Sequence, residues 1–247
     1  PNFAANPTMV SVQDGSWSSP ATWSLGRLPE AQDISEIRHQ VAYDSQTGIA
    51  DVIGIGGGAS LRFRADTATR LQVGVLKVFE DGTLEIGTAA NPIAPTVTAE
   101  LIIRNRPLNL ATDPRQFGTG LLSHNGTVTM HGSVKSPTFI RTASEPRAGN
   151  TAITLEQPAA GWRVGDRIFV PDTRQVHPDH WFDPNWALQM EERTIQGISS
   201  DGRTITLSSA LNFDHRGARD ANGTPTILPS GIKFLPHVGN LTRNVII

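Results

Sequence analysis

The chain has no cysteine, which excludes disulfide bonds, thiolate metal sites and cysteine nucleophiles. Its charge is nearly balanced, with 21 basic and 23 acidic side chains, and it contains no basic cluster of the kind that binds nucleic acid. No apolar run approaches the roughly 20 residues that a membrane-spanning helix needs. We therefore expect no nucleic-acid partner and no membrane segment in this chain.

The residues that are abundant favour β-structure. The sequence has 23 Gly and 17 Pro together with many Thr, Val and Ile, and few of the runs that helices prefer. Short apolar runs alternate with turn signals, and they predict strands at 34–41, 49–55, 60–63, 71–79, 83–86 and 98–103. Many short strands with almost no helix predict an all-β fold, either a stacked β-solenoid or a sandwich.

Three further patterns predict local structure. Gly161–Val170 reads as two short strands around a tight turn, in which Gly165 takes a positive φ and Asp166 bonds its own backbone. Hairpins are expected at Asn125-Gly126 and at Asp201-Gly202. Trp17 and Trp23 lie six residues apart among small residues and are expected to pin a loop to a sheet, with carbohydrate stacking as the alternative.

The least regular segment, 176–192, concentrates large aromatic and polar side chains. Asp183 followed by Pro184 is a typical helix start, so a short helix is expected over 185–192. Aromatic faces stack on sugar rings while carboxylates and imidazoles bond sugar hydroxyls. The predicted substrate-binding residues are therefore Trp181, Phe182, Trp186, His180 and Asp183, unless these aromatics plug the end of the β-structure.

The same segment offers donor atoms for a divalent cation. The candidates are His177, Asp179, His180 and Asp183, although their spacing matches no recognised metal motif. No cofactor is required by any pattern in the sequence, and a divalent cation stays open.

Candidate catalytic groups lie just beyond this segment. Glycosidases use a pair of carboxylates, one acting as an acid and one ionised. Glu191 and Asp214 are the candidate carboxylates and His215 is a candidate proton carrier. The alternative is that Asp214 and His215 cap a turn.

Several landmarks together resemble the eight-glycine (G-eight) domain. They are Trp17–Trp23 with Gly26–Pro29, Asp81–Thr88, His131-Gly132, Trp162–Ile168 with Thr173, Asp214-His215 before Gly217, and Leu241–Val245. This family includes fibrocystin-like proteins, hyaluronan-depolymerising cell-surface proteins and bacterial secreted proteins. The resemblance implies a secreted or cell-surface protein, a polysaccharide or glycan partner, and a right-handed parallel β-helix with antiparallel hairpins and little helix.

The resemblance also sets the expected domain organisation. We expect one G-eight-type β domain over 1–247, with the core match at about 11–217 and the start of a following β-helix at 236–247. The chain opens without a leader and ends on an apolar strand, so a longer parent protein is expected.

One departure from the family limits what it implies about activity. In the hyaluronan-depolymerising relatives a further domain separates the His-Gly and Trp-x-x-Gly-Asp landmarks, whereas here a short connection joins His131 to Trp162. Hyaluronidase activity therefore cannot be carried over. Two functions stay open: an extracellular polysaccharide-interacting domain, either by itself or as part of a polysaccharide hydrolase or depolymerase, and a non-catalytic adhesion or capping module of the cell surface.

Overall fold

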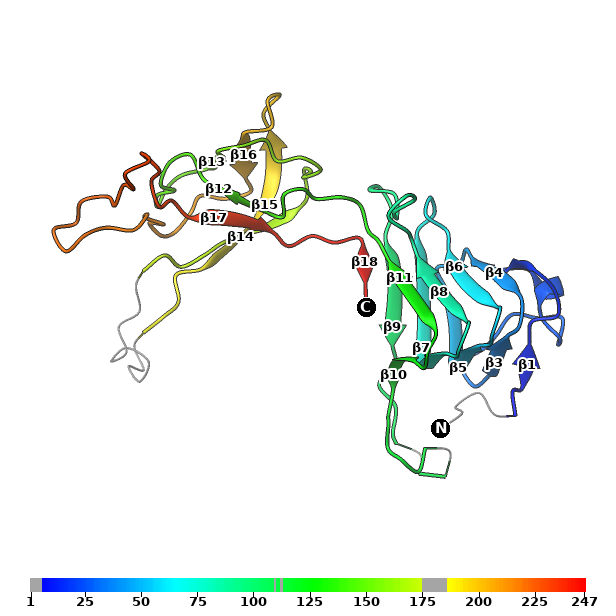
Figure 1. Ribbon diagram of the computed structural model, residues 1–247. Coiled ribbons are helices and arrows are strands. Elements are labelled where there is room, and N and C mark those ends of the chain that lie inside the picture. Colours follow the sequence, from blue (N-terminus) through cyan, green and yellow to red (C-terminus); the bar gives the residue numbers. More distant parts are fainter. Residues whose placement is uncertain (1–5, 109, 112, 175–185) are drawn as a thin grey trace. The chain divides into compact units, whose positions relative to one another are not determined.

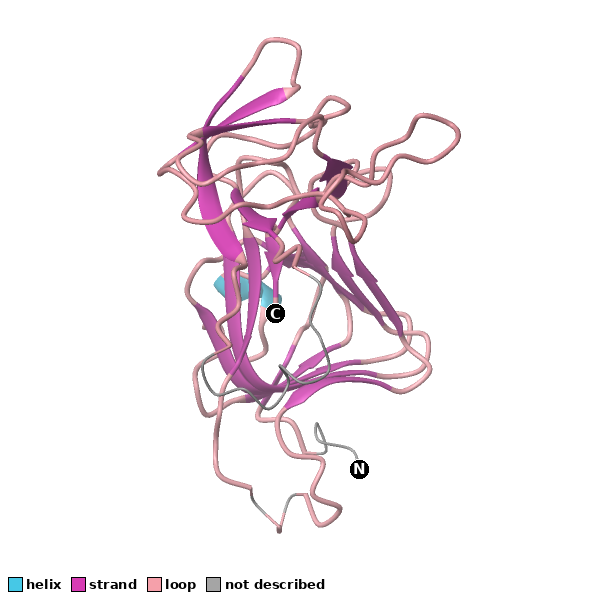
Figure 2. Ribbon diagram, turned by 90° about the vertical axis from the view of Figure 1, so that its left-hand side faces the viewer, coloured by secondary structure: helices cyan, strands magenta, loops and turns pink. Residues whose placement is uncertain are grey.

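The computed structural model describes residues 6–108, 110–111, 113–174 and 186–247 (Figure 1). The chain divides into two compact units, the first made of Pro1–Ser133 with Arg243–Ile247 and the second of Val134–Thr242. Strands dominate both units, and the one helix in the described ranges is the 3-10 turn η1 (Pro20–Thr22; Figure 2). None of the described helical residues forms a helix of the length and apolar character that a membrane span requires.

The first unit consists of two parallel sheets. One contains, in spatial order, β1 (Met9–Val10), β3 (Ile34–Ile37), β5 (Gly48–Ile55), β7 (Thr69–Val78), β9 (Ala99–Ile103) and β18 (Val245–Ile246), with β10 (Gly120–Ser123) also paired to β7. The other contains β2 (Gly15–Ser16), β4 (Gln40–Tyr43), β6 (Ser60–Phe63), β8 (Thr83–Ile86) and β11 (Thr127–Met130). Consecutive strands from β1 to β8 alternate between the two sheets, so the chain changes sheet at every turn.

The alternation of buried and exposed side chains along the strands shows where the core of this unit lies. Val41, Leu61 and Leu84 stand in register on three neighbouring strands and are almost fully buried. Their polar neighbours in sequence point to the opposite face, because successive side chains of a strand alternate. Buried apolar side chains from both sheets join in one cluster. The all-β prediction is confirmed, with parallel pairing throughout the named strands of this unit.

Two buried tryptophans anchor the first part of the chain to the sheet. Trp17 and Trp23 are buried, with ring centroids 4.9 Å apart in an edge-to-face arrangement. The indole N–H of Trp23 donates to the carbonyl of Trp17 at 2.9 Å, and Trp17 also packs against Tyr43 of β4. The predicted anchoring role is confirmed, and this burial leaves neither ring free to stack on a sugar.

The turns between the two sheets require close backbone approach. The N–H of Gly56 donates to the carbonyl of Ile37 at 2.9 Å and that of Gly58 to the carbonyl of Asp81 at 3.0 Å, which links neighbouring turns. A Cβ on Gly82 would lie 2.7 Å from the carbonyl oxygen of Ile55, so only glycine fits there. The hairpin predicted at Asn125-Gly126 is wrong, because β10 and β11 on either side of this turn belong to different sheets.

The second unit is built on an antiparallel sheet. Its spatial order is β12 (Phe139–Arg141), β17 (His237–Asn240), β14 (Arg167–Val170), β15 (Glu191–Ile198), β16 (Thr204–Leu207) and β13 (Ala152–Thr154). Just beyond β12 and β13, Thr142 and Leu155 form an antiparallel bridge, which brings the two end strands together. A separate apolar cluster fills this unit and includes Ile140, Ile168 and Ile205. The predicted hairpin at Asp201-Gly202 is confirmed as β15 and β16.

The stretch 161–170 contains only one of its two predicted strands. Residues 161–166 form turns and β14 begins at Arg167, so the first strand is wrong. Trp162 is buried with its indole N–H on the carbonyl of Pro137, whereas Val164 is 65% exposed, so the apparent alternation does not mark one sheet face. The turn itself is confirmed: Gly165 has φ +90°, and the carboxylate of Asp166 accepts from the N–H of Arg163 at 2.8 Å.

Two other expectations have clear outcomes. The helix expected over 185–192 is wrong in its described part, because residues 186–190 have no regular structure and Glu191 begins β15. Strand pairing with β14 prevails over the helix-start signal of the preceding Asp-Pro pair. The right-handed β-helix and the single-domain organisation stay predictions.

Candidate functional site around Glu191 and His215

The structure brings two of the three candidate catalytic residues together. The Nε2 atom of His215 lies 3.0 Å from Oε1 of Glu191, and both side chains are almost completely buried. Glu191 opens β15, and His215 lies in the irregular segment that follows β16. This contact spans 24 residues of sequence, so no local pattern could have revealed it.

Hydrogen-bond donors surround the carboxylate of Glu191. It accepts from the backbone N–H groups of Asn212 at 2.8 Å and Phe213 at 2.9 Å, and from the guanidinium of Arg193. Burial alone raises the pKa of Glu191, but the bonds from Asn212, His215 and Phe213 and the charge of Arg193 outweigh it and lower the pKa overall. Glu191 is therefore an ionised structural acceptor at neutral pH.

The imidazole of His215 faces an acceptor on each side. Nδ1 lies 2.7 Å from the carbonyl oxygen of Pro171, which can only accept, so this nitrogen carries a proton. Nε2 lies 3.0 Å from the carboxylate of Glu191, so both ring nitrogens are in contact with an acceptor. With its exposed fraction at 0%, His215 has no route to a substrate in this conformation.

Asp214 lies next to His215 in sequence but makes different contacts. Its carboxylate accepts from Arg216 at 2.9 Å, from the N–H of Ala148 at 3.1 Å and from Arg147 at 3.1 Å. These contacts, led by the bond from Arg216, lower the pKa of Asp214 to about 2. An acid–base pair for sugar cleavage needs one carboxylic acid with a raised pKa, whereas Glu191 and Asp214 are both shifted downward. Their catalytic role stays a prediction.

Of the predicted substrate-binding residues, Trp186 is described. Its ring is half-buried and lies beneath the guanidinium of Arg174, 4.1 Å from the ring centroid. Arg174 also pairs with Asp172 and donates to the carbonyl of Ala187 at 2.7 Å, while the N–H of Gln189 donates to Asp172 at 2.9 Å. These contacts join residues 172–174 to residues 186–189, which come just before and just after residues 175–185, here called the aromatic segment.

The other predicted binding and metal residues lie outside the described residues. These are His177, Asp179, His180, Trp181, Phe182 and Asp183. Within the ranges that the structure does describe, no group of three or more histidine, aspartate and glutamate side chains could hold a metal ion. Both the metal and the sugar-stacking roles of this segment stay predictions.

Sequence reasoning missed the basic partners of these acids. Arg193 follows Glu191 by two residues on β15, and this spacing places both side chains on one face of a strand. Glu145 binds Arg219, through both carboxylate oxygens, and Arg147. The pair with Arg193 was predictable from strand periodicity, whereas the contact of Glu145 with Arg219 joins segments more than 70 residues apart.

About half of the chain matches a known protein family. Residues 22–143 match the G8 domain, the eight-glycine domain that the sequence resembles. The comparisons therefore support a G8 domain in this chain.

Its relatives are much longer proteins. The chain is 29% identical over 236 residues to mouse fibrocystin-L and 29% identical over 235 residues to human fibrocystin-L, which covers 94% of this chain and 5% of each relative. It is 26% identical over 236 residues to mouse fibrocystin, again covering 94% of the chain and 5% of the relative. The chain thus spans about one twentieth of the length of these proteins.

Proposed function

We propose that this chain is a non-catalytic extracellular module of a longer protein, in which it caps and starts a parallel β-structure. The observation that carries this proposal is the last strand: β18 adds to the parallel sheet beside β9, with Val245 opposite Ala99. The alternation of strands between two parallel sheets is the arrangement that a β-helix repeats, and it supports a right-handed β-helix continuing after the module.

The contacts of Asn244 support this role for the end of the chain. Its side-chain amide donates to the carbonyl oxygens of Ile93, Ala94 and Val97, and its oxygen accepts from the N–H of Ser133 at 2.8 Å. A Cβ at Gly132 would lie 2.6 Å from that oxygen, which explains why glycine follows His131. Two of the family landmarks therefore meet where the chain re-enters the sheet.

Relatives and chemistry support the other parts of the proposal. The G8 match and the similarity to fibrocystin-L and fibrocystin favour a secreted or cell-surface location. The burial of Glu191 and His215 and the lowered pKa of Asp214 favour a module without acid–base catalysis.

Hydrogen exchange tests the capping role. The outer edge of β11 has no neighbouring strand among the described residues. The N–H groups of Thr127 and His131 donate toward β8, so the amides of Val128 and Met130 face the outer edge and should exchange quickly in this chain. In a longer version of the protein that continues the sheets, the amides of Val128 and Met130 should exchange at least tenfold more slowly. Equal exchange in both proteins would contradict the proposal.

Polysaccharide binding is the second candidate function, in its simple form or as part of a hydrolase or depolymerase. It is favoured by Trp186, which Arg174 holds at the stem of the aromatic segment. Incubation with neutral and acidic polysaccharides should show binding that Trp186→Ala weakens, without shortening of the chains. Shortening that disappears in Glu191→Gln, with the fold retained, would establish an enzyme instead.

A further inference from the structure

The sequence contains three Asn-x-Thr triplets in which the middle residue is not proline. They are Asn125-Gly126-Thr127, Asn222-Gly223-Thr224 and Asn240-Leu241-Thr242. Such a triplet is the acceptor for N-linked glycans in secreted proteins, and it needs an exposed position because the glycan is bulky and hydrophilic. The structure separates the three triplets by their exposure and their contacts.

We propose that Asn125 is an acceptor for an N-linked glycan. Its Nδ2 atom displaces a lipid diphosphate from C1 of the first sugar of a lipid-linked oligosaccharide. The N–C1 bond forms, the bond from C1 to the diphosphate oxygen breaks, and the proton lost from Nδ2 accompanies the released diphosphate. The sugar donor and the transferase belong to the secretory pathway, so this inference rests on the extracellular location in the proposed function and goes beyond the capping role.

The turn between β10 and β11 presents this triplet to solvent. Asn125 and Thr127 are both exposed, and Asn125 has φ +57°, a left-handed conformation that asparagine tolerates in turns. Gly126 packs inward, because a Cβ there would lie 2.5 Å from Cγ1 of Val78 and 2.6 Å from the carbonyl oxygen of Phe79. The middle residue of the triplet therefore faces the preceding turn, whereas the acceptor and its threonine keep their exposed surface.

That preceding turn shows that the backbone does not require asparagine at this position. Asp81-Gly82-Thr83 has the same arrangement: Asp81 is exposed with φ +61°, and Thr83 opens β8 in register with Thr127. Aspartate satisfies the left-handed position there, but it has no amide nitrogen and cannot accept an N-linked glycan. The amide of Asn125 is therefore not explained by the turn alone.

Asn240 has the same triplet but lies in the interior of the second unit. Its exposed fraction is 2%, and its Nδ2 atom donates to the carboxylate of Asp166 at 2.8 Å. The hydroxyl of Thr242 accepts from the N–H of Arg167 at 2.7 Å. A sugar on Nδ2 has no room beside this buried carboxylate, so we expect Asn240 to stay unmodified.

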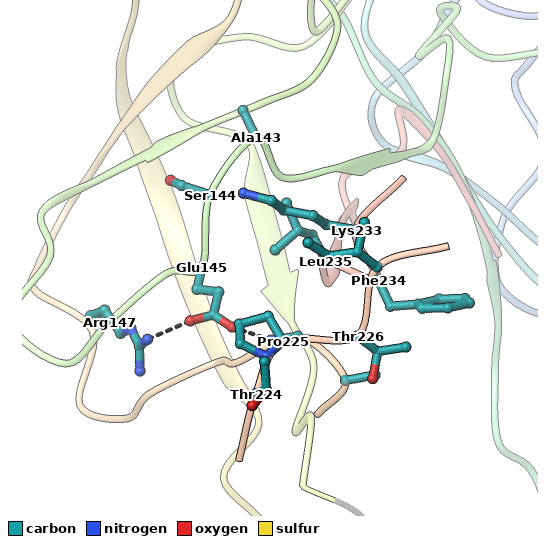
Figure 3. A pocket seen from close by; sticks show the side chains of 13 residues that line it. Ala143, Ser144, Glu145, Arg147, Thr224, Pro225, Thr226, Lys233, Phe234 and Leu235 are labelled. Carbon is teal, nitrogen blue, oxygen red and sulfur yellow. Dashed lines mark hydrogen bonds and ion pairs between the residues drawn. The ribbon is translucent and has the colours of Figure 1, made fainter. Parts of the chain in front are cut away.

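Asn222 is exposed in a turn, but the surroundings of its threonine differ. Thr224 and Pro225 line a cavity of about 470 Å³ together with parts of 143–147 and 233–235 (Figure 3). Pro225 also restricts the backbone of Thr224 to extended conformations. Because the transferase must reach the threonine hydroxyl together with the asparagine amide, the concave surface and the proline make Asn222 the weaker acceptor. The proposal is therefore confined to Asn125.

Secretion of the whole chain from cultured animal cells, behind an added signal peptide, tests the proposal. Mass spectrometry of intact glycopeptides should find an N-linked glycan on Asn125 and none on Asn240, and peptide-N-glycosidase should remove it. An unmodified Asn125 in the secreted, folded chain would overturn the proposal. A glycan on Asn240 would overturn the argument from exposure on which the choice of Asn125 depends.

Exchanges between the two stacked turns separate the acceptor from the turn. Asn125→Asp gives the later turn the sequence of the earlier one, so the chain should fold and lose the glycan. Asp81→Asn creates an Asn-Gly-Thr triplet in the earlier turn and should add a second glycan there. Failure to gain this glycan, with the fold retained by circular dichroism, would show that the turn geometry does not make an acceptor.

Threonine variants test the other end of the triplet. Thr127→Ser keeps the triplet and should retain the glycan on Asn125, whereas Thr127→Ala should lose it. Thr129→Ala, on the same strand but outside any triplet, is the matched control and should change nothing. A glycan on Asn125 that persists in Thr127→Ala would contradict the assignment of this triplet.

This test is independent of the one for capping. A glycan on Asn125 with equal hydrogen exchange in the short and the longer protein would support the acceptor and contradict the capping role. An unmodified Asn125 with slowed exchange in the longer protein would overturn the acceptor and leave the capping role standing.

Discussion

At the scale of the residue, the charged side chains that looked catalytic in the sequence have structural contacts. Glu191 accepts from two backbone N–H groups, from Arg193 and from His215, and Asp166 similarly accepts from Lys135, Arg163 and Asn240. A buried charge is tolerated only when such partners replace water. These two carboxylates therefore hold segments of the second unit together.

The first prediction compares two adjacent glutamates of β15. Glu191→Gln should lower the free energy of unfolding by about 3 kcal/mol, because it leaves Arg193 buried without its counter-charge. Glu192 is exposed and pairs with exposed Arg167, so Glu192→Gln is the matched control and should cost less than about 1 kcal/mol. Urea unfolding at pH 7 measures both, and equal losses would show that burial of Glu191 contributes nothing.

The second prediction concerns the pH dependence of this contribution. The pKa of Glu191 is lower in the folded chain than its ordinary value of 4.5, so the folded state favours the ionised form. The resulting stabilisation is fully present above pH 4.5 and is lost as the pH falls through the lowered folded-state pKa. The stability difference between the wild type and Glu191→Gln should therefore be constant from pH 7 to about 5 and shrink below about 4.5. A difference that grows on acidification would contradict the assignment of Glu191 as an ionised acceptor.

At the scale of the element, sequence periodicity located strands better than it located their partners. The bounds of β6 and β8 agree with the predicted runs, because alternation in Leu61-Arg62-Phe63 or Leu84-Glu85-Ile86 marks one buried face. The same alternation says nothing about which strand lies alongside. Asn125-Gly126 shows this limit, because its local signal suits a hairpin while the parallel partners of β10 and β11 are distant in sequence.

The third prediction tests the turns that connect the two parallel sheets. Gly82→Ala should cost about 2 kcal/mol, since the new methyl group would meet the carbonyl oxygens of Ile55 at 2.7 Å and Gly56 at 2.9 Å. Gly56→Ala, at the neighbouring turn, is the control, because its Cβ would meet only the carbonyl of Ile37 at an ordinary 3.4 Å. Chemical denaturation of both variants measures the difference, and a neutral Gly82→Ala would show that this turn can shift.

At the scale of the whole molecule, the sequence predicted an all-β chain with G-eight landmarks. It did not predict that the chain divides into two compact units. The strands of the second unit are antiparallel, and they occupy the sequence between β11 and β18, two strands of the first unit. Local patterns could not show this, because β18 pairs with β9 across more than 140 residues. The candidate site was likewise predictable in its residue types, but not in the burial of Glu191 and His215, which depends on packing between distant segments.

The last prediction asks whether the two units unfold separately. Each has its own cluster of buried apolar side chains, with Leu61 at the centre of the first sheet pair and Ile205 in the antiparallel sheet of the second. Leu61→Ala and Ile205→Ala should each cost about 3 kcal/mol, because truncation leaves a cavity in a fully buried site. For units of this size such a loss lowers the Tm by roughly 10 °C. Differential scanning calorimetry should resolve two transitions, with Leu61→Ala moving one and Ile205→Ala the other. If both variants shift a single transition by the same amount, the units unfold cooperatively, and the single-domain organisation expected from the sequence would be the correct description.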